Sequence, residues 1–245
     1  MLNRDRIVSQ LNSPYAVTVV EEIPSTNTAL KEMVSPPVGT TLIAARQTGG
    51  RGRLGRTFHS PEGGLYLSTL LCPPDPNPGR ITCCAAVAAA RAIESLCDAP
   101  IDVKWVNDLY LNGRKVAGIL AEGVLTPDGT LTAVVLGIGI NVGVTDFPDA
   151  LQPIATSLGN QGFHLTREDV AAAFLNELPT ALTDPIAMDE YRRRNLVLGR
   201  EVTVLRGGES YTATAESITD EGHLTVRDDN GNTHTLSSGE VSVRL

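Results

Sequence analysis

The fold is decided by residues 101–142, which read IDVKWVNDLYLNGRKVAGILAEGVLTPDGTLTAVVLGIGINV. Short apolar runs bounded by turn residues predict four strands there, over residues 101–106, 109–111, 115–122 and 131–140. Asn112-Gly113 is the pair that type I′ hairpin turns favour, and Asp128-Gly129 indicates a second hairpin turn. The stretch is therefore expected to fold as antiparallel hairpins that end in the most apolar strand of the chain.

The residues that flank this stretch alternate between strand and helix signals. Further strands are expected over residues 40–45 and 64–71. An alanine-rich helix with few polar positions is predicted at residues 81–97, and most of it should be buried. Other helices are expected at residues 4–11, at residues 28–33 behind a cap formed by Ser25-Thr26-Asn27, from about residue 166, and between Pro185 and Arg194.

After Asn195 the sequence becomes alternating and rich in strand formers. Five short strands, separated by glycine-containing turns, predict a small barrel. The expected domains are residues 1–195 and residues 196–245. From Gly199 onward we count eight acidic residues against four arginines, so this domain is net negative. Docking or structural support is therefore favoured over tracking of phosphates.

The composition limits the class of protein. At 245 residues, with a net charge of −8 and 42% hydrophobic residues, the chain is typical of a soluble globular protein. It contains no run of roughly 18 apolar residues and no apolar stretch of signal-peptide length near its start, so we expect a cytoplasmic protein without a membrane partner. The acidic balance argues against nucleic-acid binding. The four cysteines lack a Cys-x-x-Cys spacing, which favours reduced thiols.

The sharpest local feature is a glycine- and arginine-rich loop. Residues 46–56 hold four arginines, four glycines and no acid. Such a loop can surround an anion with guanidinium groups and backbone N–H groups. Gly50 to Gly55 also fits the G-x-G-x-x-G pattern, but the following residues, TFHSP, start a helix poorly, and we reject a dinucleotide-binding fold. A solvated flexible loop stays open as the alternative.

A second feature is a set of charged residues on the two strands of the first predicted hairpin. Only three of the 20 basic residues are lysines, and two of them, Lys104 and Lys115, flank the sequence WVND. Asp108 and Lys115 would begin partner strands and could line one pocket, where they would hold Mg²⁺ and a phosphate. The alternative is an exposed hairpin with scattered charges.

A third feature is the pair of glycines in the apolar strand that ends at residue 140. Gly137 and Gly139 favour close approach of a ligand or of another backbone, and Asn141 is a candidate partner for a ribose or phosphate. Tight packing with a bulge is an equally good interpretation. The chain lacks a phosphate-loop, nucleophile-elbow or zinc-helix motif, and its four histidines have no partner at metal-ligand spacing.

Taken in order, these segments resemble the biotin protein ligases, which are biotin carboxyl-carrier protein ligases, of the type without an N-terminal DNA-binding domain. The resemblance rests on STN, AARQTGGRGRLGR, SPEGGLYLS, KWVNDLYLNGRKVAGILAE, GIGINV and GEVSVR. It implies an α+β fold, with a mixed β-sheet catalytic domain of the class II synthetase-like type and a small SH3-like barrel. It also implies two steps: formation of biotinyl-5′-AMP from biotin and ATP, and transfer of biotin to a carrier-protein lysine.

The resemblance assigns roles by position. The expected biotin contacts are Ser25, Thr26, Asn27, Gln47, Arg51, Gly52, Arg53, Lys115, Gly118 and Gly139. The expected ATP or adenylate contacts are Arg51, Arg53, Arg56, Phe58, Lys104, Asn107 and Asn141, with Asp108 as the magnesium ligand. Arg53 and Lys115 would act as the catalytic charges. The chain departs from the family pattern at Phe58, where a tryptophan is usual, and at Val106, where a proline is common.

The partners implied are biotin, ATP, Mg²⁺ and a biotin carboxyl carrier protein. Strand edges of the catalytic sheet could pair two chains as a homodimer. The alternatives are a lipoate or octanoate ligase of the same fold and a non-catalytic biotin-binding regulator. The short N-terminal segment leaves no room for a winged helix, so we expect no binding to nucleic acid.

Overall fold

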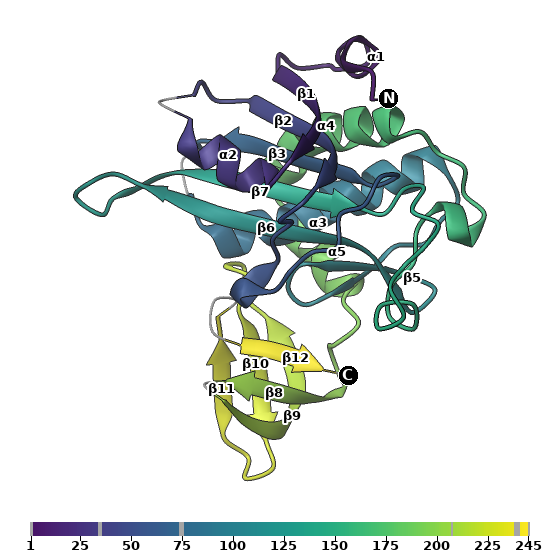
Figure 1. The fold of residues 1–245 in the computed structure, drawn as a ribbon. Helices are drawn as coiled ribbons and strands as arrows, with labels where there is room; N and C mark the ends of the chain where they lie inside the picture. Colours follow the sequence, from purple (N-terminus) through teal and green to yellow (C-terminus); the bar gives the residue numbers. More distant parts are fainter. Residues whose placement is uncertain (1, 34–35, 74–75, 207, 238–240, 245) are drawn as a thin grey trace.

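A seven-stranded sheet lies at the centre of the larger part of the molecule, which comprises β1 to α5 (Figure 1). The computed structural model describes residues 2–33, 36–73, 76–206, 208–237 and 241–244. The strand order is β1-β2-β3-β7-β6-β5-β4. The strands are β1 (Ala16–Ile23), β2 (Thr40–Gln47), β3 (Leu65–Leu71), β4 (Asp102–Lys104), β5 (Asp108–Leu111), β6 (Arg114–Leu125) and β7 (Leu131–Ile140). Only β1 and β2 pair in parallel, so the sheet is mixed, as predicted.

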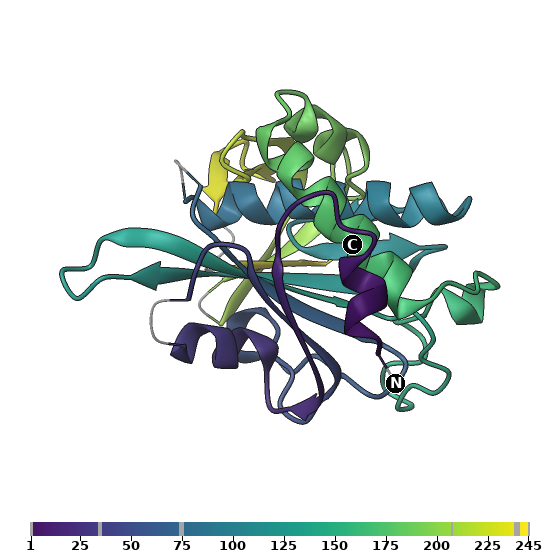
Figure 2. The ribbon, with the colours of Figure 1, turned by 90° about the horizontal axis from the view of Figure 1, so that it is seen from above.

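Helices cover both faces of this sheet (Figure 2). One face carries α3 (Pro78–Leu96), α4 (Arg167–Thr183) and α5 (Ala187–Arg193), and α1 (Arg4–Val8) packs against α4. The other face carries α2 (Thr26–Glu32), which contacts β2, β3 and β7. The alanines of α3 are buried, which explains the sparse polar positions in its sequence. None of the helices in the described part of the chain has the length and apolar character of a bilayer span.

The C-terminal residues form a second, five-stranded antiparallel sheet with the order β11-β10-β9-β8-β12. Its strands are β8 (Glu201–Arg206), β9 (Glu209–Ile218), β10 (Leu224–Asp228), β11 (Thr233–Leu236) and β12 (Val241–Arg244). The predicted small β-domain is confirmed, whereas closure into a barrel stays a prediction because β11 and β12 are the edges of the described sheet. The β9–β10 turn docks on the larger part, where Gly222 O accepts a 3.0 Å hydrogen bond from the indole of Trp105.

The structure corrects two details of the predicted elements. The sequence predicted no strand before residue 40, yet β1 forms there as an edge strand in which Val17 is the one fully buried residue. The strand expected at residues 101–106 ends at Lys104, and Trp105 to Asn107 form the turn that joins it to β5. The Asn112-Gly113 hairpin turn is confirmed, with positive φ angles of 50° and 75°.

Candidate active site

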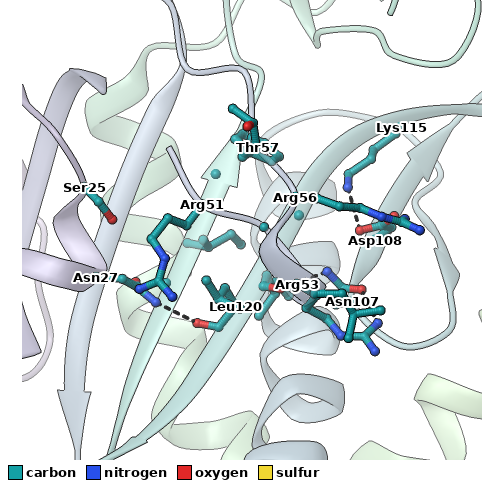
Figure 3. A pocket seen from close by; sticks show the side chains of 18 of the residues that line it. Ser25, Asn27, Arg51, Arg53, Arg56, Thr57, Asn107, Asp108, Lys115 and Leu120 are labelled. Atoms are coloured by element: carbon teal, nitrogen blue, oxygen red, sulfur yellow. Dashed lines mark hydrogen bonds and ion pairs between the residues drawn. The ribbon is translucent and has the colours of Figure 1, made fainter. Parts of the chain in front are cut away.

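A cavity of about 170 Å³ lies over β6 and β7, beside the start of α2 and under the glycine- and arginine-rich loop (Figure 3). All ten residues expected to contact biotin line it. Arg56, Phe58, Lys104, Asn107 and Asp108 line it as well, so segments far apart in the sequence meet at one site.

Neutral polar groups form the wall next to α2. Ser25 caps this helix and accepts from Thr28 N. The backbone N–H and hydroxyl of Thr26 donate to Gln47 Oε1 at 2.9 Å and 3.1 Å, and Gln47 Nε2 donates to Ser60 Oγ at 3.1 Å. These bonds fix the rotamers of a wall that can recognise an uncharged polar ligand by hydrogen bonding.

Three glycines of β6 and β7 form the floor and admit neighbouring side chains. A Cβ on Gly137 would lie 2.0 Å from Asn27 Oδ1, and a Cβ on Gly139 would lie 2.5 Å from Cε1 of Phe58. A Cβ on Gly118 would lie 3.0 Å from the same ring. The resemblance implied that Gly118 and Gly139 let the backbone approach biotin; in this structure their bare Cα atoms seat the Phe58 ring.

The loop over the cavity folds back on itself. Phe58 N donates to Gly50 O at 2.9 Å, and Gly52 N donates to Arg56 O at 2.7 Å. At its tip, the 3₁₀ turn η1 (Arg53–Gly55), Arg53 Nη1 donates to Asn107 Oδ1 at 3.1 Å. Burial lowers the pKa of Arg53, partly offset by the negative charge of Asp108. Through its bond to Asn107, the guanidinium is held in the lining of the cavity.

An ammonium on β6 and a carboxylate on β5 meet at the cavity. Lys115 Nζ lies 2.6 Å from Asp108 Oδ1 and 5.6 Å from the centroid of the Phe58 ring. Figure 3 shows this pair facing the loop that carries Arg53 and Arg56. With Arg51 and Lys104, five cationic side chains line one small cavity in a protein of net charge −8. Such an arrangement stabilises negative charge that gathers during a reaction.

Magnesium fits this site only as a metal that arrives with phosphates. Within the described residues, no three His, Cys, Asp or Glu side chains cluster as metal ligands. Mg²⁺ is commonly held by one or two carboxylates together with substrate phosphates. Asp108 supplies one carboxylate at the cavity, so the site suits a metal–nucleotide complex better than a resident ion.

One predicted residue does not reach the cavity. Asn141 is buried directly after the end of β7, where its Nδ2 donates to Thr156 O at 2.9 Å and its Oδ1 has no hydrogen-bond partner among the described residues. Its role in nucleotide binding stays a prediction.

The sequence analysis also missed several residues of the site. Ser60 and Ser68 hold its polar wall, and Glu122 binds Arg51. All three lie within the quoted motifs SPEGGLYLS and KWVNDLYLNGRKVAGILAE, but no role was assigned to them, because only the pairing of distant strands brings them together.

The chain matches two families along its length. Residues 19–141 match the Biotin/lipoate A/B protein ligase family, and residues 197–244 match the Biotin protein ligase C terminal domain. The motif-based resemblance is therefore confirmed.

Named relatives agree with these matches. The chain is 33% identical to the biotin–acetyl-CoA-carboxylase ligase of Mycobacterium tuberculosis, over 97% of this chain and 92% of that protein. It is 44% identical over 127 residues to the bifunctional ligase/repressor BirA of Bacillus spizizenii, and this match spans only 39% of the Bacillus protein and 50% of this chain.

A solved structure supports the same conclusion. The biotin protein ligase from Aquifex aeolicus in complex with biotin and ATP superimposes with a TM-score of 0.81 at 32% identity. The superposition covers 93% of this chain and 98% of that one. This likeness confirms the predicted fold class over nearly the whole chain, in addition to the strand order described above.

Proposed function

This chain belongs to the biotin/lipoate A/B protein ligase family, and we propose that it activates biotin with ATP and transfers it to a carrier-protein lysine. The observation that carries the proposal is the gathering of Arg51, Arg53, Arg56, Lys104 and Lys115 around one cavity with a neutral polar wall. The cations suit two reacting anions, and the wall suits the uncharged ring of the vitamin.

In the first step a carboxylate oxygen of biotin attacks the α-phosphorus of ATP. The bond from that phosphorus to the bridging oxygen breaks, pyrophosphate leaves, and biotinyl-5′-AMP remains. Two anions must approach each other, so the step needs local positive charge. We assign this role to Lys115 and Arg53, which approach the cavity from β6 and from the loop.

The remaining contacts divide between the two substrates. Ser25, Thr26 and Gln47 are proposed to hydrogen-bond the biotin ring system, with Asn27 beside them. Arg56, Lys104 and Asn107 are proposed to bind the nucleotide, with the Phe58 ring as the adenine contact. Magnesium bound with ATP would neutralise the pyrophosphate leaving group, and Asp108 is the carboxylate proposed to hold it.

In the second step a neutral lysine amine of the carrier attacks the carbonyl of the mixed anhydride. AMP leaves, and the amine loses a proton as the amide forms. The loop must shield the anhydride from water and still admit a lysine. A biotin-accepting domain of acetyl-CoA carboxylase is the proposed acceptor, because the Mycobacterium tuberculosis relative is named for that substrate.

Other expectations from the sequence stay predictions. These are the boundary between residues 1–195 as the catalytic domain and residues 196–245 as the C-terminal domain, the cytoplasmic location, the homodimer and the absence of nucleic-acid binding.

The test is exchange of labelled pyrophosphate into ATP, measured with biotin and separately with lipoate. We expect exchange that depends on biotin and is negligible with lipoate. Exchange driven by lipoate would assign the chain to the other substrate class of its family. Binding of biotin without any exchange would indicate a non-catalytic biotin-binding protein.

A further inference from the structure

Glu122 is a largely buried carboxylate on β6 that the proposed reaction does not use. Its side chain is 15% exposed. Oε1 lies 3.2 Å from Lys31 Nζ and 3.2 Å from Arg51 Nη2. Oε2 accepts from Asn27 Nδ2 at 3.0 Å and from Arg51 Nη1 at 3.3 Å. The carboxylate therefore joins α2, β6 and the glycine- and arginine-rich loop.

One of these bonds sets the orientation of a cavity wall. Asn27 Oδ1 accepts a 2.6 Å hydrogen bond from Ser68 Oγ, while its Nδ2 donates to Leu120 O and to Glu122. An ionised carboxylate only accepts hydrogen bonds, so Glu122 can pair only with the amino end of the amide. The amide is held with its oxygen over Gly137.

The other contacts hold the base of the loop. Arg51 lines the cavity already described and also a second cavity of about 240 Å³, which Glu122 lines too. Side-chain contacts hold the loop near its base, where Arg51 binds Glu122, and at its tip, where Arg53 binds Asn107, in addition to the backbone bond from Gly49 N to Pro24 O.

The charge of Glu122 is maintained in this environment. Burial acts to raise the pKa of the carboxyl. Hydrogen bonds from Asn27 and Lys31 and the charges of Lys31 and Arg51 outweigh it, so the pKa lies below its usual value. The group is ionised at neutral pH and can anchor a guanidinium.

We propose that Glu122 is a positioning residue that anchors the loop through Arg51 and orients Asn27, so that Arg53 is held over the cavity. The role in catalysis rests on the proposed function, whereas the anchoring of the loop does not. A solvent-exposed ion pair would stabilise the loop only slightly, because water and salt screen its charges. Glu122 differs because it binds three side chains from two separate segments.

The decisive experiment measures how fast trypsin cleaves the loop after Arg51, Arg53 and Arg56 in the unliganded protein. Glu122→Gln keeps the size of the side chain and removes its charge. We expect cleavage about tenfold faster than in the wild type, because hydrogen bonds to charged groups are the strong ones. Glu22→Gln is the matched control, since it breaks an exposed Arg–Glu pair, with Arg46, away from the cavity. That variant should be cleaved at the wild-type rate.

A second readout connects the anchor to the reaction. In pyrophosphate exchange, Glu122→Gln should raise the KM for biotin severalfold, with a smaller change in kcat. Glu122→Asp keeps the charge and should restore part of both readouts. In the trypsin assay, with cleavage compared after Arg53 and Arg56, Arg51→Gln should loosen the loop to the same extent as Glu122→Gln, and the double variant should be cleaved no faster than Arg51→Gln alone.

Each outcome decides a separate question. Wild-type cleavage rates in both Glu122→Gln and Arg51→Gln would overturn the anchoring role. If Glu122→Gln unfolds, the cleavage rate of Arg51→Gln, which leaves the Asn27 bond intact, decides it. If Glu122→Gln is cleaved faster but the wild type shows no biotin-dependent exchange, the proposed function is overturned and the anchoring role stands.

Discussion

Removal of the Lys115 ammonium is the perturbation that should damage the first step most. In Lys115→Ala the cavity loses a cation whose side chain is 29% exposed and which faces Asp108 at 2.6 Å. The variant also leaves this partly buried carboxylate without its partner, which adds a negative charge where two anionic substrates must meet.

The magnitude follows from the partial burial of the site. Two unit charges about 4 Å apart interact by about 1 kcal/mol in water and by about 4 kcal/mol at an effective dielectric constant of about 20. Because the side chain of Lys115 is only partly exposed, its interaction energy lies between these two values, closer to the value at a dielectric constant of about 20. A loss of about 3 kcal/mol in the transition state corresponds to a rate about 100-fold lower.

The assay is biotin-dependent exchange of labelled pyrophosphate into ATP, which isolates adenylation from transfer. Arg114→Ala is the matched control, because it removes a positive charge from the adjacent position of β6 whose side chain does not line the cavity. We expect near wild-type exchange in that control. Lys115→Arg should restore little activity, since the end of the lysine packs 3.2 Å from the Cβ position of Gly118.

Normal exchange by Lys115→Ala would refute the reasoning. It would mean that the ammonium binds Asp108 for structural reasons and takes no part in charge stabilisation. Loss of folding would be recognised separately from the melting temperature, and Lys115→Met then supplies a variant of similar volume without the charge.

The remaining predictions concern the floor, the loop and the carboxylate anchor. Gly139→Ala should displace the Phe58 ring at a cost of about 1–3 kcal/mol and raise the KM for ATP, and Phe58→Leu in the same chain should recover part of the lost stability, measured as the melting temperature. Arg53→Ala should still form the adenylate slowly but should release biotinyl-AMP into solution about 10- to 100-fold faster, because a charged hydrogen bond to Asn107 of about 1.5–3 kcal/mol is lost; unchanged retention on a filter would count against a covering role for the loop. The pKa of Glu122 is lowered in the folded protein, so the stabilising effect of the carboxylate is complete above the unfolded pKa of about 4.3 and is lost as the pH falls through the folded value. The difference in melting temperature between wild type and Glu122→Gln should therefore be constant from pH 8 to 5 and shrink below about pH 4. A difference that grows in acid would contradict the assignment.

Local sequence signals predicted the parts of the fold that depend on local physics. The Asn112-Gly113 pair forms its hairpin because both residues can adopt positive φ. The alanine-rich helix is buried along most of its length, and the loop of glycines and arginines does lie over a cavity. A cap was predicted within Ser25-Thr26-Asn27 for a helix over residues 28–33; Ser25 is that cap, and the helix begins earlier, at Thr26.

The parts that were missed depend on contacts between distant segments. β1 was not predicted because an edge strand has no clear alternation of buried positions, and its partner β2 is joined to it by a crossover. The contact of Glu122 with Arg51 exists only because the β6–β7 pairing places Gly118 opposite Gly139 and carries Glu122 past α2. The burial of Asn141 at the end of β7, against Thr156, could likewise not be predicted from a polar residue that follows an apolar strand.

We propose that one cavity joins biotin to ATP and passes the product to a lysine. The most direct measurement is mass spectrometry of a biotin carboxyl carrier domain incubated with the protein, biotin and ATP, with biotinyl-AMP analysed in the same mixture before the carrier is added. We expect biotinyl-AMP first, and then one biotinyl group on one lysine of the carrier, both abolished without ATP. Bound biotin with neither adenylate nor modified carrier would contradict it.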